Sequence, residues 1–519
     1  AEEAVREEIA RLIDGGVSEP ELQKARNMAL ANQIATLASM RGQAADLGSN
    51  WLLTGNLSFS RDYLRRLAEV DVDQLSEVAD RYLIDRTLSA IEVSAEVHHP
   101  APDQIVAAAG EDEHELFELE NGMRVVIQPD RRLPMVSLCA AFRGGLLAED
   151  ASVSGITELF ASSLMQGSER RSAEELAAAM ESLGGNADAG SGNNSFFVCA
   201  GAIAPDSPVA FDLVAEVLRI PAFPAEAVQR EREAQLADIE DENQRPIGLA
   251  FNAAKRALFT DHPYAQSRLG CADTVSGLEP QNLRLFHDHY AVAGNGVLSI
   301  CGDIEPAAAR DLAEEHFAKL REGPAAFRNP AEPAWPELAQ ERVEHLDKEQ
   351  AVVVVALPGV ELASPDRAAI NLILQACSGM DGRLFFRIRE KLGLAYFTGA
   401  TQLVGLAGGG LLFYAGTRPD AADDVTVELL DELKNVAQHG LDDEEIERAK
   451  RIYAGRHSIE KQSHRARAQG AALDVLYDLG YGHDERLLES IGSLDRGAVS
   501  EAAARYLSSS AKICVKVVP

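Results

Sequence analysis

The sequence is short of basic side chains and lacks any long apolar run. Its 519 residues include 49 Lys and Arg against 82 Asp and Glu, a formal net charge of −33. Binding to phosphate groups needs clustered Lys and Arg, so this deficit argues against nucleic acids and anionic membranes as partners. Apolar runs such as 351–357 are strand-sized and well below the roughly 18 residues needed to span a bilayer. The acidic surface fits either attraction of basic peptides or plain solvation.

Cysteine is also sparse, and no two cysteines form a C-x-x-C pair. The six cysteines are Cys139, Cys199, Cys271, Cys301, Cys377 and Cys514. Most of them lie in apolar, strand-like surroundings, a pattern typical of buried free thiols rather than of a zinc knuckle or a disulfide framework. Apolar residues make up 46 % of the chain and charged residues 25 %, which is the balance of a folded globular protein. Disorder is therefore excluded for most of the chain, and the length predicts about three domains.

The chain contains a long internal repeat. The segment 76–83 returns 424 residues later as 500–507, and the same offset carries Gly16 to Gly440. An upstream helix opens in both copies with a capping-box pattern, Ser18-x-x-Glu21 and Asp442-x-x-Glu445. A fainter third copy lies between them. One tyrosine marks each copy: Tyr82, Tyr290 and Tyr506.

This spacing predicts a domain of about 210 residues, used repeatedly, in the usual size range of domains. Strand patterns at 123–127, 297–301 and 352–355 alternate with helical ones, so we expect an α+β fold of sheets covered by helices. The expected organisation has one partial and two complete copies. Its boundaries are 1–97 (carboxyl-terminal part of a truncated domain), 98–113 (linker), 114–322 (complete domain), 323–340 (Pro-rich linker) and 341–519 (final domain). Because Ala1 lies inside an amphipathic pattern with no initiator Met or signal peptide, we expect that something upstream has been removed.

Several segments together resemble a known enzyme family. The stretch 155–168, Gly-Ile-Thr-Glu-Leu-Phe-Ala-Ser-Ser-Leu-Met-Gln-Gly-Ser, is similar to the motif region of the pitrilysin/insulinase-type zinc metallopeptidases, the inverzincins, which include the mitochondrial processing peptidases. Further matching stretches are 121–125, 143–145, 183–187, 262–264 and 301–303. The resemblance covers essentially the whole chain, and it implies the family's fold and an involvement in peptide hydrolysis.

The family's zinc motif is H-x-x-E-H, in which two imidazoles one helical turn apart hold the metal and the Glu activates water. At the matching positions this chain has Glu158, Ala161 and Ser162, and the third ligand position falls near Asp238. Carboxylates without imidazole or thiolate make a poor zinc site. We therefore expect no metal in this chain, with Glu158 solvated and the other two residues packed; the resemblance places zinc on a missing half or a partner. The histidine pair His287-x-His289 is expected to be structural.

A second motif is retained in the final domain. Residues 382–396, Gly-Arg-Leu-Phe-Phe-Arg-Ile-Arg-Glu-Lys-Leu-Gly-Leu-Ala-Tyr, resemble the family's R-E-K-x-G-L-A-Y segment. The resemblance implies that Arg389 and Tyr396 reach substrate at the metal of the zinc-binding half, where a guanidinium and a phenol can donate to the oxyanion. By residue type alone, Arg389 would be a surface charge and Tyr396 a core aromatic. The family's peptide-binding edge strand matches 184–192, but 190–194 is glycine-rich and more typical of a loop or hairpin.

The resulting hypothesis is a carboxyl-terminal, zinc-less portion of a two-unit peptidase, from a bacterial source. It would enclose a peptide substrate and complete a zinc site on an N-terminal half or homologous catalytic subunit that carries H-x-x-E-H. The chain alone would be inactive, so its status as an enzyme is left open. The rival is a non-proteolytic assembly subunit of the same family, as in the mitochondrial cytochrome reductase complex. Neither the cleavage preference nor the compartment, periplasm or cytoplasm, follows from the sequence.

Overall fold

The chain forms two compact units, unit 1 (Ala1–Ala109) and unit 2 (Gly110–Pro519). The computed structural model describes residues 40–82, 114–132, 135–182, 186–327 and 330–519, together with residues 11, 17–19 and 22. Among these residues, none of the helices combines the length and the apolar character needed to cross a membrane.

The described part of unit 1 is helical. Its helices are α3 (Met40–Thr54), α4 (Phe59–Glu69) and α5 (Val72–Tyr82). Most of the helix expected to follow Ser18 lies outside the described residues. The same holds for the linker predicted at 98–113.

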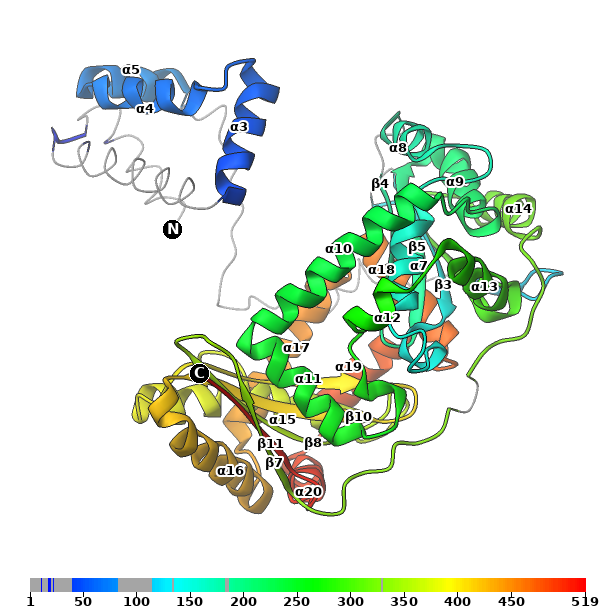
Figure 1. Cartoon of the computed structure of the whole chain (residues 1–519). Helices are drawn as coiled ribbons and strands as arrows, with labels where there is room; N and C mark the ends of the chain where they lie inside the picture. The colour runs from blue at the N-terminus through cyan, green and yellow to red at the C-terminus, as the bar shows by residue number, and fades with distance from the viewer. Residues whose placement is uncertain are drawn as a thin grey trace. The chain divides into compact units, whose positions relative to one another are not determined.

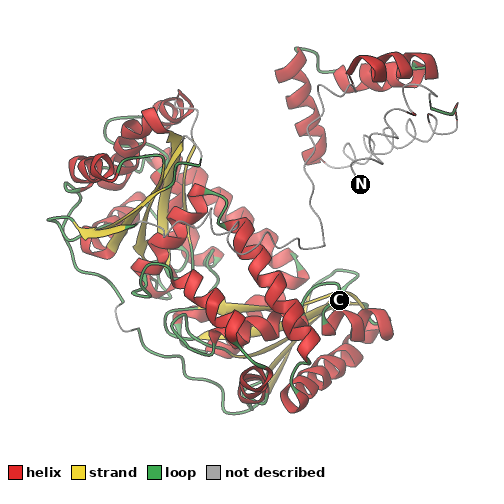
Figure 2. Ribbon diagram, turned by 180° about the vertical axis from the view of Figure 1, so that it is seen from behind, coloured by secondary structure: helices red, strands yellow, loops and turns green. Residues whose placement is uncertain are grey.

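Unit 2 contains two β-sheets, each drawn as a yellow layer among red helices in Figure 2. The first, here called the N-sheet, has the strand order β1-β2-β6-β3-β5-β4 in the described residues. All neighbours are antiparallel except β2 and β6, which are parallel. Its strands are β1 (Glu115–Glu118), β2 (Arg124–Pro129), β3 (Met135–Arg143), β4 (Asn186–Ser191), β5 (Ser195–Ile203) and β6 (Gly296–Gly302).

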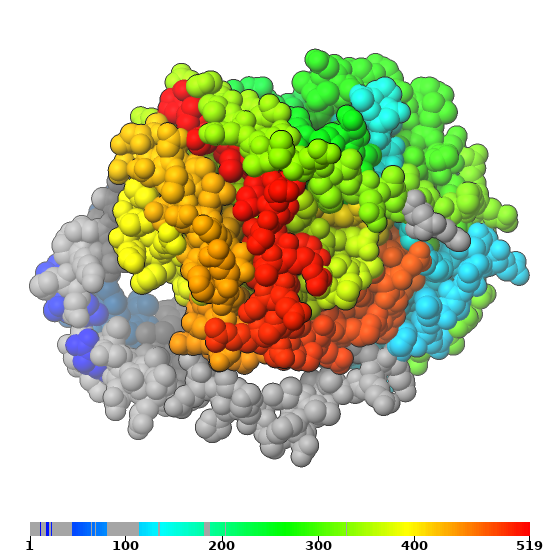
Figure 3. Space-filling view, turned by 90° about the horizontal axis from the view of Figure 1, so that it is seen from below, coloured from blue at the N-terminus to red at the C-terminus, as the bar shows by residue number. Residues whose placement is uncertain are grey.

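The second sheet, here called the C-sheet, has the described order β7-β11-β8-β10-β9. This is the order of the N-sheet without β1, and again one pair, β7 and β11, is parallel while the others are antiparallel. Its strands are β7 (Gln340–His345), β8 (Ala351–Pro358), β9 (Ala395–Val404), β10 (Gly409–Thr417) and β11 (Ile513–Val518). Figure 3 shows the red end of the chain lying beside the light green segment that contains β7.

The helices of unit 2 fall into two sequential groups. Those that follow the first strands of the N-sheet are α7 (Ile156–Leu164), α8 (Ala173–Ser182), α9 (Ser207–Arg219), α10 (Ala225–Gln244), α11 (Pro246–Phe259), α12 (Ala272–Ser276), α13 (Pro280–Tyr290) and α14 (Pro306–Phe317). Those of the C-terminal half are α15 (Arg367–Cys377), α16 (Ala422–His439), α17 (Asp443–Glu460), α18 (His464–Leu476), α19 (His483–Ser493) and α20 (Arg496–Leu507).

Both sheets are covered on both faces, and this explains their sequences. Strand β8 is buried along nearly its whole length because helices shield alternate side chains on opposite faces, so it reads as a continuous apolar run. The predicted strands 123–127, 297–301 and 352–355 correspond to β2, β6 and β8. The capping box at Asp442 is present: its carboxylate accepts from the Glu445 N–H at 2.9 Å, and the Glu445 side chain accepts from the Asp442 N–H at 2.8 Å. Local sequence signals therefore located these elements.

The two halves of unit 2 exchange helices. One face of the N-sheet packs on α7, α9, α13 and α14, while the opposite face is covered by α18, which comes from the C-terminal half. Reciprocally, α11 leaves the N-terminal half and covers the C-sheet opposite α15, α16 and α20. Alanines line both exchanged helices where they meet the strands, at Ala253 and Ala254 of α11 and at Ala471 and Ala472 of α18. Their small side chains let the helix backbone approach the sheet closely.

Arginines fasten the exchanged helix α18 to the N-sheet. Arg143 of β3 is almost fully buried, and its guanidinium donates to the carbonyl of Leu476 at 2.9 Å and to Asp478 at 2.6 Å. Arg124 of β2 donates to Val475 and also to Asp478. The two halves of unit 2 are thus joined by buried, charge-assisted hydrogen bonds as well as by apolar packing.

The structure corrects the interpretation of two cysteines. Cys139 of β3 and Cys199 of β5 are directly opposed in the antiparallel register and form a disulfide. Free thiols were expected at both positions. The spacing of the two residues along the chain, 60 positions, gave no sign of this pairing, because strand register brings them together.

Candidate functional site

Helix α7 carries the positions of the degenerate zinc motif, and a buried carboxylate holds its first turn. Gly155, at φ +89°, precedes the helix, and Glu149 accepts hydrogen bonds from the Gly155 N–H at 2.7 Å and the Thr157 N–H at 3.0 Å. Burial raises the pKa of Glu149 to about 7, although these hydrogen bonds favour its charged form. The first turn of α7 is therefore held by the Glu149 carboxyl group, whose pKa is raised.

Glu158, which the sequence resemblance matches to the first zinc ligand, forms an ion pair. The Glu158 carboxylate accepts from the guanidinium of Arg268 and from the hydroxyl of Ser191, and Arg268 also donates to Ser191 at 3.2 Å. The Glu158 side chain is 25 % exposed. It was expected to be solvated, and the structure instead places it in a part-buried ion pair. The Arg268 guanidinium thus neutralises the Glu158 carboxylate.

The other motif positions offer no imidazole or thiolate. Ala161 is 1 % exposed in the core, and the Ser162 hydroxyl donates to the carbonyl of Leu159 at 3.2 Å. Asp238 of α10 is exposed, and the neighbouring buried Gln235 donates its amide to the carbonyls of Gly155 and Leu269. A methyl, a hydroxyl, a carboxylate neutralised by arginine and one exposed carboxylate do not fit zinc, which is held by several imidazole, thiolate or carboxylate donors together. In the described part of the chain, no group of three or more His, Cys, Asp and Glu side chains is placed to hold a metal.

Of the two histidines expected to be structural, His287 is packed in the interior, whereas His289 is exposed. His287 lies on α13, with its Nε2 2.7 Å from the carbonyl of Leu218 and its ring packed near Phe160. Burial lowers the pKa of His287 below its usual value. Its neighbour His289 packs edge-on against Tyr290.

The Arg/Tyr segment adopts an unusual conformation that the sequence did not reveal. Residues Phe385–Lys391 form a π-helix, η7, which packs against β9. Such single π turns are rare and often occur at functional sites. Two arginines fasten the segment to α16 and α17: Arg383 pairs with Glu432 and Glu445, and Arg387 pairs with Glu432.

Arg389 differs from these two anchors. Its guanidinium lies 4.8 Å from the ring centre of Phe385, and it makes no hydrogen bond or ion pair with any described residue. Tyr396, on the edge strand β9, is 53 % exposed and is therefore not the core aromatic that its residue type suggested. Met380, Phe386 and Leu392, in and around η7, are also exposed. The segment around η7 therefore exposes a cation, a phenol and apolar side chains to solvent, while ion pairs to α16 and α17 hold its backbone in place.

The edge of the N-sheet is better formed than its glycines suggested. Gly190 and Ser191 belong to strand β4, which pairs with β5 on one side and is the last strand of the described N-sheet. The hairpin expected around 190–194 is present, but its first part is a regular strand.

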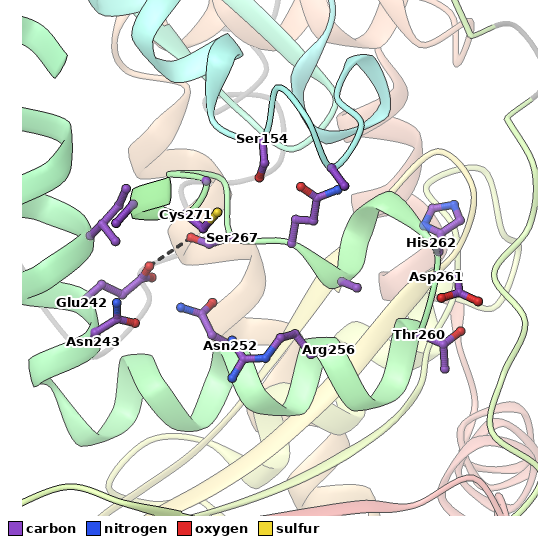
Figure 4. Close-up of a pocket in the computed structure, with 16 residues that line it drawn as sticks. Ser154, Glu242, Asn243, Asn252, Arg256, Thr260, Asp261, His262, Ser267 and Cys271 are labelled. Carbon is purple, nitrogen blue, oxygen red and sulfur yellow. Dashed lines mark hydrogen bonds between the residues drawn. The ribbon is translucent and has the colours of Figure 1, made fainter. Parts of the chain in front are cut away.

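A cavity of about 560 Å³ with a mixed polar and apolar lining lies next to the motif region, between the C-terminal half of α10 and α11. Figure 4 shows Glu242 on α10 and Asn252 and Arg256 on α11 along one side of it, with Ser154 and Cys271 across from them. The Ser267 hydroxyl donates to Glu242 at 3.0 Å. Ile239, the residue after Asp238 on α10, also lines the cavity, whereas Asp238 does not.

Two family models match consecutive parts of the chain. The family model described as "Insulinase (Peptidase family M16)" matches residues 124–272, which include the degenerate motif. The model described as "Peptidase M16 inactive domain" matches residues 277–453, which include Arg389 and Tyr396. A protein of Streptomyces coelicolor named "uncharacterized zinc protease" is 30 % identical over 347 residues, 64 % of this chain and 73 % of its own length.

The chain belongs to the insulinase family, peptidase family M16. A second M16 relative, an "uncharacterized zinc protease" of Rickettsia bellii, is 24 % identical over 77 % of this chain and 96 % of its own length. The crystal structure of a peptidase M16 inactive domain from Pseudomonas fluorescens superposes with a TM-score of 0.74 at 25 % identity, covering 78 % of this chain and 98 % of that one. The bacterial sources of these relatives agree with the source expected from the sequence.

Proposed function

We propose that this M16 chain is the non-catalytic half of a two-unit peptidase, which encloses a peptide and acts on it together with a unit that carries zinc and H-x-x-E-H. One contrast carries the proposal. Glu158, matched to a zinc ligand by the resemblance alone, pairs with Arg268, whereas the Arg389 guanidinium has no polar partner among the described residues. The Glu158 carboxylate is thus already paired, whereas the Arg389 guanidinium is available to a substrate.

The finer domain organisation forms part of this proposal. Residues 1–97 would be the end of an upstream domain, 114–322 and 341–519 the two complete copies, and 98–113 and 323–340 the linkers. The shared strand order of the N-sheet and the C-sheet supports the pairing of the two complete copies.

The chemical role proposed for Arg389 and Tyr396 is to donate hydrogen bonds. Hydrolysis of a peptide bond builds negative charge on the carbonyl oxygen, and a guanidinium and a phenol positioned before the reaction stabilise that charge. Neither group needs to transfer a proton in this role. Exposure of both side chains leaves them accessible to a peptide held by the opposite unit.

The test uses the full chain mixed with an M16 unit that carries H-x-x-E-H, and a fluorogenic peptide as substrate. Replacing Arg389 by Ala, or Tyr396 by Phe, should lower kcat/KM by about 10²–10³-fold, the usual effect of removing one oxyanion donor. Arg451→Ala is the matched control, because Arg451 is also an exposed arginine on the C-terminal half. Equal kinetics for all three variants would remove Arg389 and Tyr396 from the mechanism. Complex formation without any hydrolysis would instead favour an assembly subunit.

A further inference from the structure

The three helices described in unit 1 repeat the last three helices of unit 2. Helices α4 and α5 begin 424 residues before α19 and α20, the offset already found in the sequence, and the described part of α3 lies at the same offset from α18. For α4 and α19, both ends coincide at this offset. Unit 1 therefore contains a second version of the exchanged helix α18.

The corner between the first two helices is built in the same way in both copies. Asn50 of α3 and its counterpart Asp474 of α18 are each 6 % exposed. The Asn50 amide donates to the Ser60 hydroxyl in the first turn of α4 at 2.9 Å, and Asp474 accepts from the His483 N–H in the first turn of α19 at 3.0 Å. A buried polar side chain at this position ties each helix to the start of the next.

The two helices differ in what covers their apolar faces. In α18, residues that pack on the N-sheet are at most 5 % exposed: Ala471, Val475 and Leu476. Their counterparts on α3 are 48 %, 61 % and 83 % exposed: Leu47, Trp51 and Leu52. A soluble protein rarely leaves large aliphatic and aromatic side chains clustered in water without a partner. The face of α3 defined by Leu47, Trp51 and Leu52 is here called the α3 face.

We propose that the α3 face docks on the open face of a β-sheet in the zinc-binding M16 unit. This rests on the proposed function. The precedent lies within the chain, because α18 covers the sheet of the domain whose α7 holds the motif positions. In the described part of unit 2 both sheets already have their exchanged helix, α18 on the N-sheet and α11 on the C-sheet. The sheet that receives α3 therefore belongs to the other M16 unit.

Side-chain size makes the α3 face selective. Trp51 replaces Val475, and Leu47 replaces Ala471, so α3 presents more volume than α18 at the same positions. Because protein interiors are close-packed, larger side chains on a helix require smaller side chains on the sheet that it covers. The receiving sheet must carry smaller side chains than the N-sheet does at Val126 and Val297, which pack in the cluster with Val475. The proposed partner is therefore defined by two properties, the H-x-x-E-H motif and small side chains on the sheet that receives α3.

Trp51 provides a direct probe of docking. The chain has two tryptophans, Trp51 and Trp335, so Trp335→Phe leaves Trp51 as the sole reporter. The probe partner is an M16 unit that carries H-x-x-E-H and ends before the helix equivalent to α3. On mixing, Trp51 emission should shift to the blue and become protected from acrylamide quenching. In the chain alone, the emission should be that of a water-exposed indole.

Variants separate docking from other contacts. Leu52→Asp should weaken binding of the probe unit by at least about 30-fold, as expected for a central apolar anchor. Arg65→Glu is the control, because Arg65 of α4 and its counterpart Glu489 are both exposed. Complex formation and hydrolysis with an unshifted Trp51 and full affinity of the Leu52 variant would overturn this inference and leave the proposed function standing. Absence of any complex would overturn both.

Discussion

The most informative perturbation of unit 2 is the removal of the Arg143 side chain. Arg143 is 2 % exposed, and its guanidinium donates to Leu476 of the exchanged helix, to Asp478, and to the carbonyls of Ala326 and Phe327. Arg143→Met keeps much of the apolar stem but leaves these acceptors without a donor. Because the Leu476 carbonyl is buried, its loss of a hydrogen-bond donor should account for most of the decrease in the free energy of unfolding.

The magnitude follows from burial. Breaking a buried charged interaction costs about 3–5 kcal/mol, whereas an exposed pair is worth about 1 kcal/mol or less. Because Asp478 is 58 % exposed, water can replace its lost partner, so the lower part of the buried range, about 3 kcal/mol, is expected. Arg124→Met is the matched comparison: Arg124 binds the same Asp478 but is 25 % exposed, and its loss should cost about 1 kcal/mol.

The assay is urea unfolding followed by tryptophan fluorescence in a Trp51→Phe background. Trp335 then reports on unit 2 alone, because it packs against Phe259 of α11. The free energies of unfolding of the two variants should differ by about 2 kcal/mol, with the Arg143 variant the less stable. If Arg143→Met is no more destabilising than Arg124→Met, the buried hydrogen bonds do not hold the two halves together.

Two further predictions concern Glu149 and the disulfide. Because the folded pKa of Glu149, about 7, lies above its unfolded value of 4.5, its contribution to stability is fully present below pH 4.5 and is lost as the pH rises through 7. Glu149→Gln should therefore be more favourable relative to the parent at pH 8 than at pH 5 in urea unfolding, and a pH-independent difference would refute the assignment. With Cys139 and Cys199 joined, alkylation in urea without reductant should modify four of the six cysteines by mass spectrometry; six modified residues would show that the disulfide is absent.

Local sequence signals predicted much of the fold. The Asp442 capping box and the strand patterns of β2, β6 and β8 rest on residues close together in the chain, whose physics is local. The exchange of α11 and α18 was not predicted. An amphipathic helix shows that it has an apolar face, but its sequence does not say which of two similar sheets will cover that face.

In the candidate site, too, residue types could be interpreted from the sequence, but long-range contacts could not. The loss of imidazole at Glu158 and Ser162 could be read directly from residue types. The partner of Glu158 could not, because Arg268 lies 110 residues away and reaches it only through the folded arrangement around α7. Similarly, the π-helix around Arg389 depends on the pairing of Arg383 and Arg387 with acids on α16 and α17. Such long-range pairing leaves no pattern in a single sequence.

The zinc content of the purified 519-residue chain tests the central claim most directly. After dialysis against zinc and then against buffer, elemental analysis should find far less than one zinc per chain, and a fluorogenic peptide should remain uncut. One tightly retained zinc per chain, together with peptide cleavage that a chelator abolishes, would show that this chain is itself a catalytic unit.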